Sequence, residues 1–237
     1  MADEFGPSSE YIAIGKRNLD YNSEEFVTGR YTFAADVNRP GKLYAKTLGA
    51  TYAHAKVVSI NASKAEALEG VKAVITIKDN PQWSETILTA GQQIAAVAAV
   101  DEATAERALD LIEVNYDVLI PVHDPAEAMK PGAPLVGTFP GGNVTPTAQQ
   151  ITYGDVTKGF TEADVTIDET VGWNSRHTHN ELEPDNTVVW WEGDNLFSWI
   201  TSQNPFAQRA SIASALKMPL NLVHVYCHGT GGGFGGK

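Results

Sequence analysis

The chain has 237 residues, of which 43% are hydrophobic and 19% charged, so it can bury a core and is not intrinsically disordered. Its 17 basic and 29 acidic side chains give a formal net charge of −12, which disfavours nucleic acid and anionic membrane surfaces as partners. The single cysteine, Cys227, excludes an internal disulfide and a set of cysteine ligands for an iron–sulfur cluster.

Residues 1–26 are expected to form an N-terminal extension. The first nine residues lack the basic stretch and apolar core of a signal peptide, and no apolar run approaches the length of a membrane span. We therefore expect a cytoplasmic protein without a membrane partner.

Residues 27–130 alternate between strand and helix periodicity, which predicts a mixed α/β domain of the α+β class. Ser63 is expected to cap the first helix, Asp101 or Thr104 the second, and Asp124 with Pro125 to begin the third. The strands expected are 56–60, 71–77, 94–100 and 111–119, and the helices end near 68, 109 and 129. The order of these elements predicts two βαβ units of similar size.

Residues 131–160 are rich in proline and glycine, which predicts a linker or covering loop. A further domain is expected over 161–237, with strands at 165–171, 187–191, 196–201 and 223–226. Asn204 is expected to cap a helix that has Pro205 at its first position and ends near residue 216.

The segment GTGGGFGGK, residues 229–237, holds six glycines in nine residues directly after a buried strand. Glycine permits positive φ angles and lets backbone N–H groups approach a ligand closely. The segment also fits GxxxxGK and GxGxxG, but both phosphate-binding motifs require a helix immediately after the glycines. A flexible tail is the alternative without a ligand.

Gln203 lies in SQNPF, residues 202–206, between a predicted strand and a predicted helix. One strand–helix–strand excursion separates it from the glycine-rich segment, so we expect both at the same end of a sheet. Its amide can point from a strand end into a cleft.

His177, His179, Glu181 and Glu183 share one parity and would face the same side of a strand. They could ligate a metal, but a polar sheet face or an internal hydrogen-bonded pair is the favoured interpretation. Cys227 is expected to be a packing residue, because only the adjacent His228 offers any activation. The tryptophans are expected in core or interface positions; they are Trp190, Trp191 and Trp199.

Taken together, these segments resemble the large molybdopterin-binding subunit of molybdenum hydroxylases, the xanthine dehydrogenase and aldehyde oxidase family. TGRYTFAAD with YAHA, and GQQIAAVAA with IEVNY, resemble the family's hammerhead domain. HNELEP, SQNPF and GGGFGGK resemble the start of its molybdenum-cofactor domain. The corresponding residues are 28–36, 52–55, 91–99, 112–116, 179–184, 202–206 and 231–237. The resemblance covers nearly all of the chain from Val27, which amounts to about the first third of a family large subunit.

The resemblance implies a molybdenum–molybdopterin cofactor, with the cytosine dinucleotide form as one option, contacted by Gln203 and by backbone at Gly233, Phe234 and Gly235. It implies no catalytic residue and no direct metal ligand in this chain, since the family's catalytic glutamate lies further along. The [2Fe-2S] clusters and FAD would be on partner subunits, together with the remaining molybdopterin-binding portion.

The implied reaction oxidises an aldehyde or an N-heterocycle with water-derived oxygen in a heteromeric complex. Two alternatives stay open at this point. The first is a family member with hydratase, alcohol dehydrogenase or reductive dehydroxylase chemistry, and the second is a non-catalytic scaffold or assembly subunit.

Overall fold

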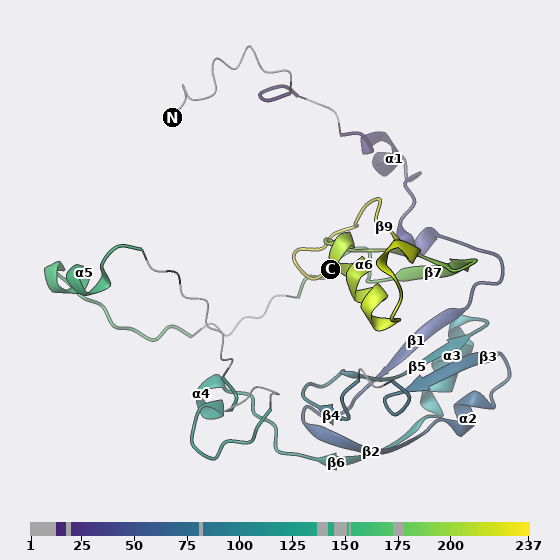
Figure 1. Cartoon of the computed structure of the whole chain (residues 1–237), viewed down its shortest axis with the longest axis horizontal. Coiled ribbons are helices and arrows are strands. Elements are labelled where there is room, and N and C mark those ends of the chain that lie inside the picture. The colour runs from purple at the N-terminus through teal and green to yellow at the C-terminus, as the bar shows by residue number, and fades with distance from the viewer. Residues whose placement is uncertain are drawn as a thin grey trace. The chain divides into compact units, whose positions relative to one another are not determined.

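A computed structural model describes residues 13–17, 20–80, 83–136, 142–144, 151, 153–172 and 178–237 (Figure 1). The chain forms two compact units. The central unit is Arg39–Asn174, and the terminal unit combines Met1–Asn38 with Ser175–Lys237. The domain boundaries expected from the sequence stay a prediction.

The central unit contains two three-stranded antiparallel sheets. The first has the order β1-β5-β3, and the second has the order β4-β2-β6. Their strands are β1 (Tyr44–Gly49), β2 (Ala55–Asn61), β3 (Val71–Thr76), β4 (Thr86–Ile87), β5 (Gln93–Ala99) and β6 (Glu113–Val118). Val57 of β2, Ile87 of β4 and Ile94 of β5 are buried in one cluster, so the two sheets share a core.

The helices of this unit are α2 (Ser63–Glu66), α3 (Glu102–Asp110), α4 (Pro125–Ala128) and α5 (Val156–Glu162). Ala105 and Ala108 of α3 and Ala65 of α2 are fully buried. Small side chains at these positions let the helices approach the sheet closely. Ala65 and Ala108 share a second core cluster with Val97 of β5.

The prediction of two βαβ units is wrong. The strands flanking α2 are β2 and β3, which belong to different sheets, and the same holds for β5 and β6 around α3. A parallel crossover within one sheet needs about a dozen or more connecting residues, whereas Asn61 and Val71 are separated by a four-residue helix and short turns. The chain therefore passes from one sheet to the other.

The predicted strand at residues 165–171 is also wrong. The structure has no strand there, and Val165, Ile167 and Val171 are 77%, 82% and 86% exposed. Strand propensity reflects packing on a sheet surface, and no described strand offers this segment such a surface. Strands β1 and β4 and helix α5 were not predicted, and α5 begins within residues 131–160, the region expected to be a linker.

Two of the predicted helix caps are present in the central unit, and one is not. Asp101 accepts a hydrogen bond from the Thr104 backbone N–H at 2.7 Å, and Asp124 accepts from the first turn of α4. Ser63 makes no capping bond. Its backbone N–H instead donates to Oδ1 of Asn61, two residues earlier, at 3.1 Å, so Asn61 orders this turn.

The cap at Asp101 predicts a specific acid response. Hydrogen bonds from the Thr104 backbone N–H and then from its hydroxyl lower the pKa of the Asp101 carboxyl. Because the unfolded-state pKa is about 3.9 and the folded value is lower, this stabilisation is present above about pH 4 and is lost as pH falls through the folded pKa. Asp101→Asn keeps the capping oxygen but does not titrate, so its stability difference from wild type should shrink in acid. Unfolding series between about pH 7 and pH 2 measure this, and a constant difference over that range would contradict it.

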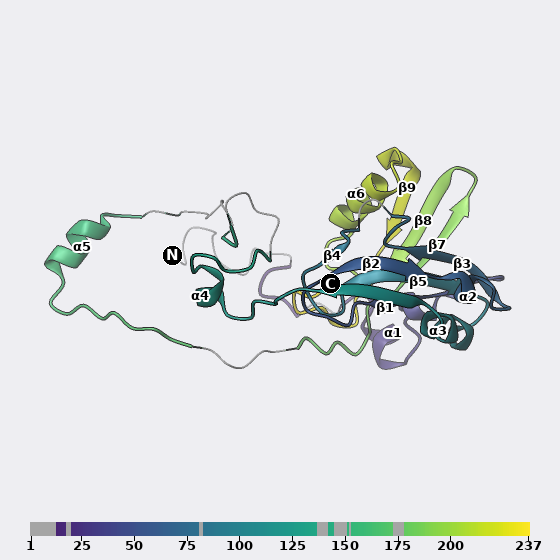
Figure 2. The same ribbon diagram turned by 90° about the horizontal axis from the view of Figure 1, so that it is seen from below.

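The terminal unit is built on one three-stranded sheet of order β7-β8-β9. Strands β7 (Thr187–Glu192) and β8 (Asn195–Ile200) form an antiparallel hairpin, and β9 (Val223–Tyr226) pairs parallel to β8. Helix α6 (Pro205–Ala215) and the turn η3 (Leu220–Leu222) make the crossover, and α6 lies along one face of the sheet (Figure 2). This part agrees with the prediction, including the Asn204 side chain that accepts from the Ala207 N–H at 3.2 Å.

The two faces of this sheet have different chemistry. Leu196 and Val223 are buried with Ala213 of α6, which forms the core. On the other face, Trp190 stacks on Phe197 with ring centroids 5.5 Å apart, and Phe197 stacks on His224 with centroids 4.7 Å apart. Trp190 and Trp199 are half-buried, whereas Trp191 is 57% exposed.

The terminal unit also contains α1 (Ser23–Val27) and the turn η2 (Ala34–Asp36). No helix among the described residues has the length and apolar character needed to span a membrane.

Candidate cofactor-binding site

Gln203 and the glycine-rich segment meet beyond the carboxyl ends of β8 and β9, as the sequence predicts. The Gly235 N–H donates to Gln203 Oε1 at 2.8 Å, and the Lys237 N–H lies 3.4 Å from the same oxygen. The Gln203 backbone N–H donates to the Lys237 carbonyl at 3.3 Å. These contacts follow from the parallel pairing of β8 with β9, which directs both strand ends to one edge of the sheet.

The centre of the glycine loop is a tight turn. The Gly236 N–H donates to the Gly233 carbonyl at 2.7 Å, and φ is +48° at Phe234 and +92° at Gly235. Positive φ at both central positions is the type I′ pattern. A phenylalanine in the left-handed region is disfavoured by about 1–2 kcal/mol, and such strain tends to occur at functional sites. No residue pattern signals this conformation in advance, because phenylalanine normally avoids it.

The hydrogen bond to Gly235 fixes the orientation of the Gln203 amide. A backbone N–H can only donate, so the side-chain atom facing Gly235 must be the oxygen. The Nε2 group therefore faces away from the loop, and among the described residues it has no acceptor. Gln203 is exposed, so this group presents two N–H donors at the surface of the site.

The four residues expected to contact a cofactor lie close together, but they differ in burial and in the space around them. Gly233 is buried, and a Cβ there would lie 2.7 Å from Gln203 Cδ, so this glycine makes room for the glutamine. Phe234 is 75% exposed, and its backbone N–H has no partner among the described residues. The space where a Gly235 Cβ would point has no atom within 4 Å. The Gly235 N–H is already used by Gln203, whereas the Phe234 N–H and Gln203 Nε2 are donors without a partner among the described residues.

Every second residue of the HNELEP segment, namely His179, Glu181 and Glu183, contacts the glycine loop. A Cβ on Gly236 would lie 2.9 Å from Glu181 Oε1 and 3.1 Å from His179 Cγ, and a Cβ on Gly231 would lie 2.6 Å from Glu183 Cβ. His179, Glu181 and Glu183 thus lie against the loop, but the prediction that they share one face of a strand is wrong, because the segment is not a strand. His177 lies outside the described residues.

No group of three or more His, Cys, Asp or Glu side chains among the described residues is arranged to hold a metal ion. The interpretation as a hydrogen-bonded polar face is the one that the described geometry supports. Glu183 shows this most clearly, since its carboxylate is buried and accepts from the Gly231 N–H at 2.6 Å.

Cys227 and Tyr31 lie on the inner side of the glycine loop. The Cys227 thiol donates to the Ser202 carbonyl at 3.0 Å, which supports a packing role for this cysteine. Burial raises the pKa of Tyr31, and electrostatic interactions with Cys227, Glu25 and Glu183 add to this effect. A Cβ on Gly229 would lie 2.1 Å from the Tyr31 hydroxyl, so the loop packs directly on this ring.

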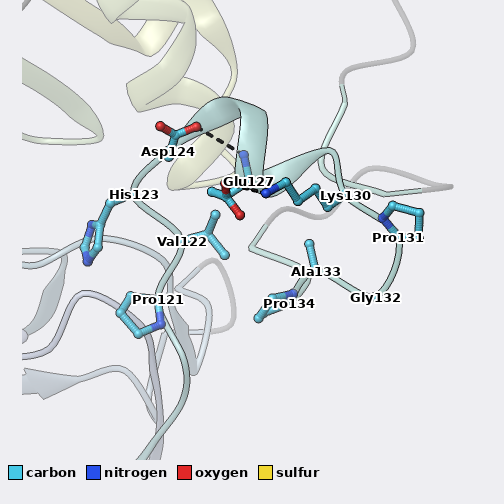
Figure 3. A pocket seen from close by; sticks show the side chains of 10 residues that line it. All are labelled: Pro121, Val122, His123, Asp124, Glu127, Lys130, Pro131, Gly132, Ala133 and Pro134. Carbon is cyan, nitrogen blue, oxygen red and sulfur yellow. Dashed lines mark hydrogen bonds and ion pairs between the residues drawn. The ribbon is translucent and has the colours of Figure 1, made fainter.

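Each of the two units has a surface hollow. One, of about 310 Å³, adjoins the loop in the terminal unit and is lined by Asn186, Thr201, Gln208 and Lys237 among others. The other, of about 520 Å³, belongs to the central unit and is formed by the turn around α4 between Pro121 and Pro134. Figure 3 shows Glu127 and Lys130 paired on its wall, where both side chains are well exposed. The first hollow touches the loop through Gly236 and Lys237, and none of the four residues expected to contact a cofactor lines it.

Comparison with known proteins identifies both halves of the chain. Residues 28–120 match the a/b hammerhead domain of aldehyde oxidase and xanthine dehydrogenase, and residues 139–237 match the molybdopterin cofactor-binding domain. The two matched domains are thus those of a molybdopterin-binding subunit. The chain belongs to the molybdenum hydroxylase family of xanthine dehydrogenases and aldehyde oxidases.

Individual relatives agree with this assignment. The chain is 32% identical to the nicotinate dehydrogenase large molybdopterin subunit of Eubacterium barkeri, over 96% of this chain and 56% of that protein. It is 29% identical to the carbon monoxide dehydrogenase large chain of Afipia carboxidovorans, over 90% of this chain and 30% of that protein. The structure of quinoline 2-oxidoreductase from Pseudomonas putida 86 aligns with a TM-score of 0.83 and 25% identity, covering 93% of this chain and 31% of that one. The chain therefore spans between about a third and just over half of these relatives.

Proposed function

We propose that this chain provides one wall of a molybdenum–molybdopterin site in a hydroxylase that oxidises an aldehyde or an N-heterocycle. The observation that carries the proposal is the fixed amide of Gln203, whose oxygen is held by Gly235 and whose N–H groups face outward. A second donor, the Phe234 N–H, lies on the same loop. Both belong to residues that resemble the family's cofactor contacts.

The donor set fits a pterin that carries its own metal ligands. Such a group needs hydrogen-bond donors and open backbone from the protein, rather than histidine, cysteine or carboxylate ligands. The loop offers two donors, an exposed turn and open space beside Gly235, while the described residues contain no competing metal-ligand cluster.

The chemistry supplied by the bound cofactor would be removal of two electrons from a substrate carbon as an oxygen atom from water is added to it. The role of this chain is to hold and orient that cofactor through Gln203 and the turn at Gly233–Gly236. The turn is already closed by the Gly233–Gly236 hydrogen bond, so the loop loses less conformational entropy when the cofactor binds. No residue of this chain is assigned to proton transfer at the substrate.

The remaining parts of such an enzyme would be on other polypeptide segments. Relatives of this chain are named as a large molybdopterin subunit and as subunit gamma of a dehydrogenase complex. One cysteine in 237 residues cannot hold an iron–sulfur cluster, so we place the [2Fe-2S] clusters on cytoplasmic partner subunits. We place FAD there as well, because the resemblance to the family implies it.

Elemental analysis of the native complex captured through this chain tests the proposal, with mass spectrometry of the chains that co-purify. We expect near-stoichiometric molybdenum together with iron and a cysteine-rich partner. An intact complex without molybdenum would overturn the cofactor role and would favour a scaffold subunit.

A further inference from the structure

Glu183 is joined to Gly231 by two hydrogen bonds of opposite direction. The Gly231 N–H donates to Glu183 Oε2 at 2.6 Å, and the Glu183 N–H donates to the Gly231 carbonyl at 3.2 Å. Contact is so close that a methyl group on Gly231 would overlap Glu183 Cβ. The first end of the GGGFGG loop is thus fixed to a single residue.

The other end of the loop is fixed to the same residue through Lys237. Lys237 Nζ donates to the Glu183 carbonyl and lies 3.6 Å from Glu183 Oε2. The two side chains are 1% and 6% exposed. Gly233–Gly236, the turn that contains Phe234 and bonds to Gln203, lies between these two fixed ends.

A buried ion pair is costly to form unless each charge is compensated and hydrogen-bonded. Here Glu183 Oε2 meets both conditions through Gly231 and Lys237, and the ammonium meets them through the carboxylate and a carbonyl. Glu183 Oε1 is buried without a hydrogen-bond partner among the described residues. A turn with positive φ at Phe234 needs such external fixing, because the conformation is disfavoured on its own.

We propose that Glu183 and Lys237 are positioning residues that hold both ends of the glycine loop, so that Phe234 N–H and Gln203 Nε2 keep their direction toward the cofactor. The inference rests on the proposed function. Neither side chain is assigned a contact with the cofactor, and each acts through the loop.

The test uses the whole complex with Glu183→Gln, Lys237→Met and the double variant. Each single change leaves one buried polar or charged group without its partner, whereas the double variant removes both charges and keeps an acceptor for the Gly231 N–H. We expect molybdenum per complex to fall about tenfold or more in each single variant and to recover substantially in the double variant. The matched control is the exposed pair Lys64–Glu113, for which Lys64→Met and Glu113→Gln should leave the molybdenum content unchanged.

Two further readouts separate positioning from a general loss of stability. Hydrogen exchange of the peptide covering residues 229–237 should accelerate in the single variants while peptides from β5 and α3 keep their protection. The electron paramagnetic resonance signal of the molybdenum that remains should broaden, because the loop no longer has one geometry. Unchanged exchange and full molybdenum in both single variants would overturn the proposal, as would an equal loss of protection throughout the chain.

The exchange measurement does not depend on the cofactor. If the wild-type complex contains no molybdenum but loop protection still falls in the single variants, the proposed function fails and the role of the pair in holding the loop stands. If molybdenum is present and neither readout changes, the positioning role fails and the proposed function stands.

Discussion

Replacing Gly233 with alanine should remove most of the molybdenum from the complex while leaving the chain folded. The new Cβ would lie 2.7 Å from Cδ and 2.9 Å from Cγ of Gln203, and the flexible glutamine would have to move. This movement breaks the hydrogen bond from the Gly235 N–H to Gln203 Oε1, so the orientation of Nε2 is no longer fixed. Loss of one such hydrogen bond lowers the free energy of unfolding by about 0.5–1.5 kcal/mol. Loss of a residue that orients the cofactor lowers cofactor retention by about 10–100-fold.

Gly159→Ala is the matched control for this prediction. Gly159 lies within α5, and a Cβ there meets no atom within 4 Å, so a methyl group should be tolerated. Molybdenum per complex and the thermal midpoint should be measured for both variants. A Gly233→Ala complex with full molybdenum would show that the position of Gln203 is not needed for the cofactor.

Gln203→Glu should reduce molybdenum retention or turnover by about 10–100-fold with little change in the loop. Glutamate keeps an oxygen for the Gly235 N–H, but it replaces the outward N–H donors with a negatively charged acceptor. The substitution therefore separates the two functions of this side chain. Gln203→Ala removes both functions and should also loosen the loop.

The control for Gln203 is Asn221→Ala, since Asn221 is an exposed amide in η3 of the same unit. Hydrogen exchange of residues 229–237 should be normal in Gln203→Glu and faster in Gln203→Ala. Equal molybdenum in wild type and Gln203→Glu would eliminate the donor role, whatever the state of the loop.

Local signals in the sequence predicted the strands and the helix that bring Gln203 and the glycine loop together. Asn204 and Pro205 begin α6, apolar positions define β8 and β9, and a single crossover brings both strand ends together. The meeting of Gln203 with the glycine loop follows from these features, because adjacent parallel strands end at one edge.

Features that depend on distant partners could not be predicted in the same way. The strands around α2 and α3 were expected to share a sheet, but periodicity does not specify which strand pairs with which. Residues 165–171 have strand propensity without a pairing partner among the described strands. The left-handed Phe234 and the buried pair of Glu183 with Lys237 depend on the loop as folded, so neither residue type signals them.

A structure of the assembled complex, purified through this chain, tests the central claim most directly. We predict a molybdenum-bearing pterin with acceptor atoms about 2.7–3.2 Å from Gln203 Nε2 and from the Phe234 N–H. A pterin bound elsewhere, with both donors facing solvent or another protein segment, would contradict it.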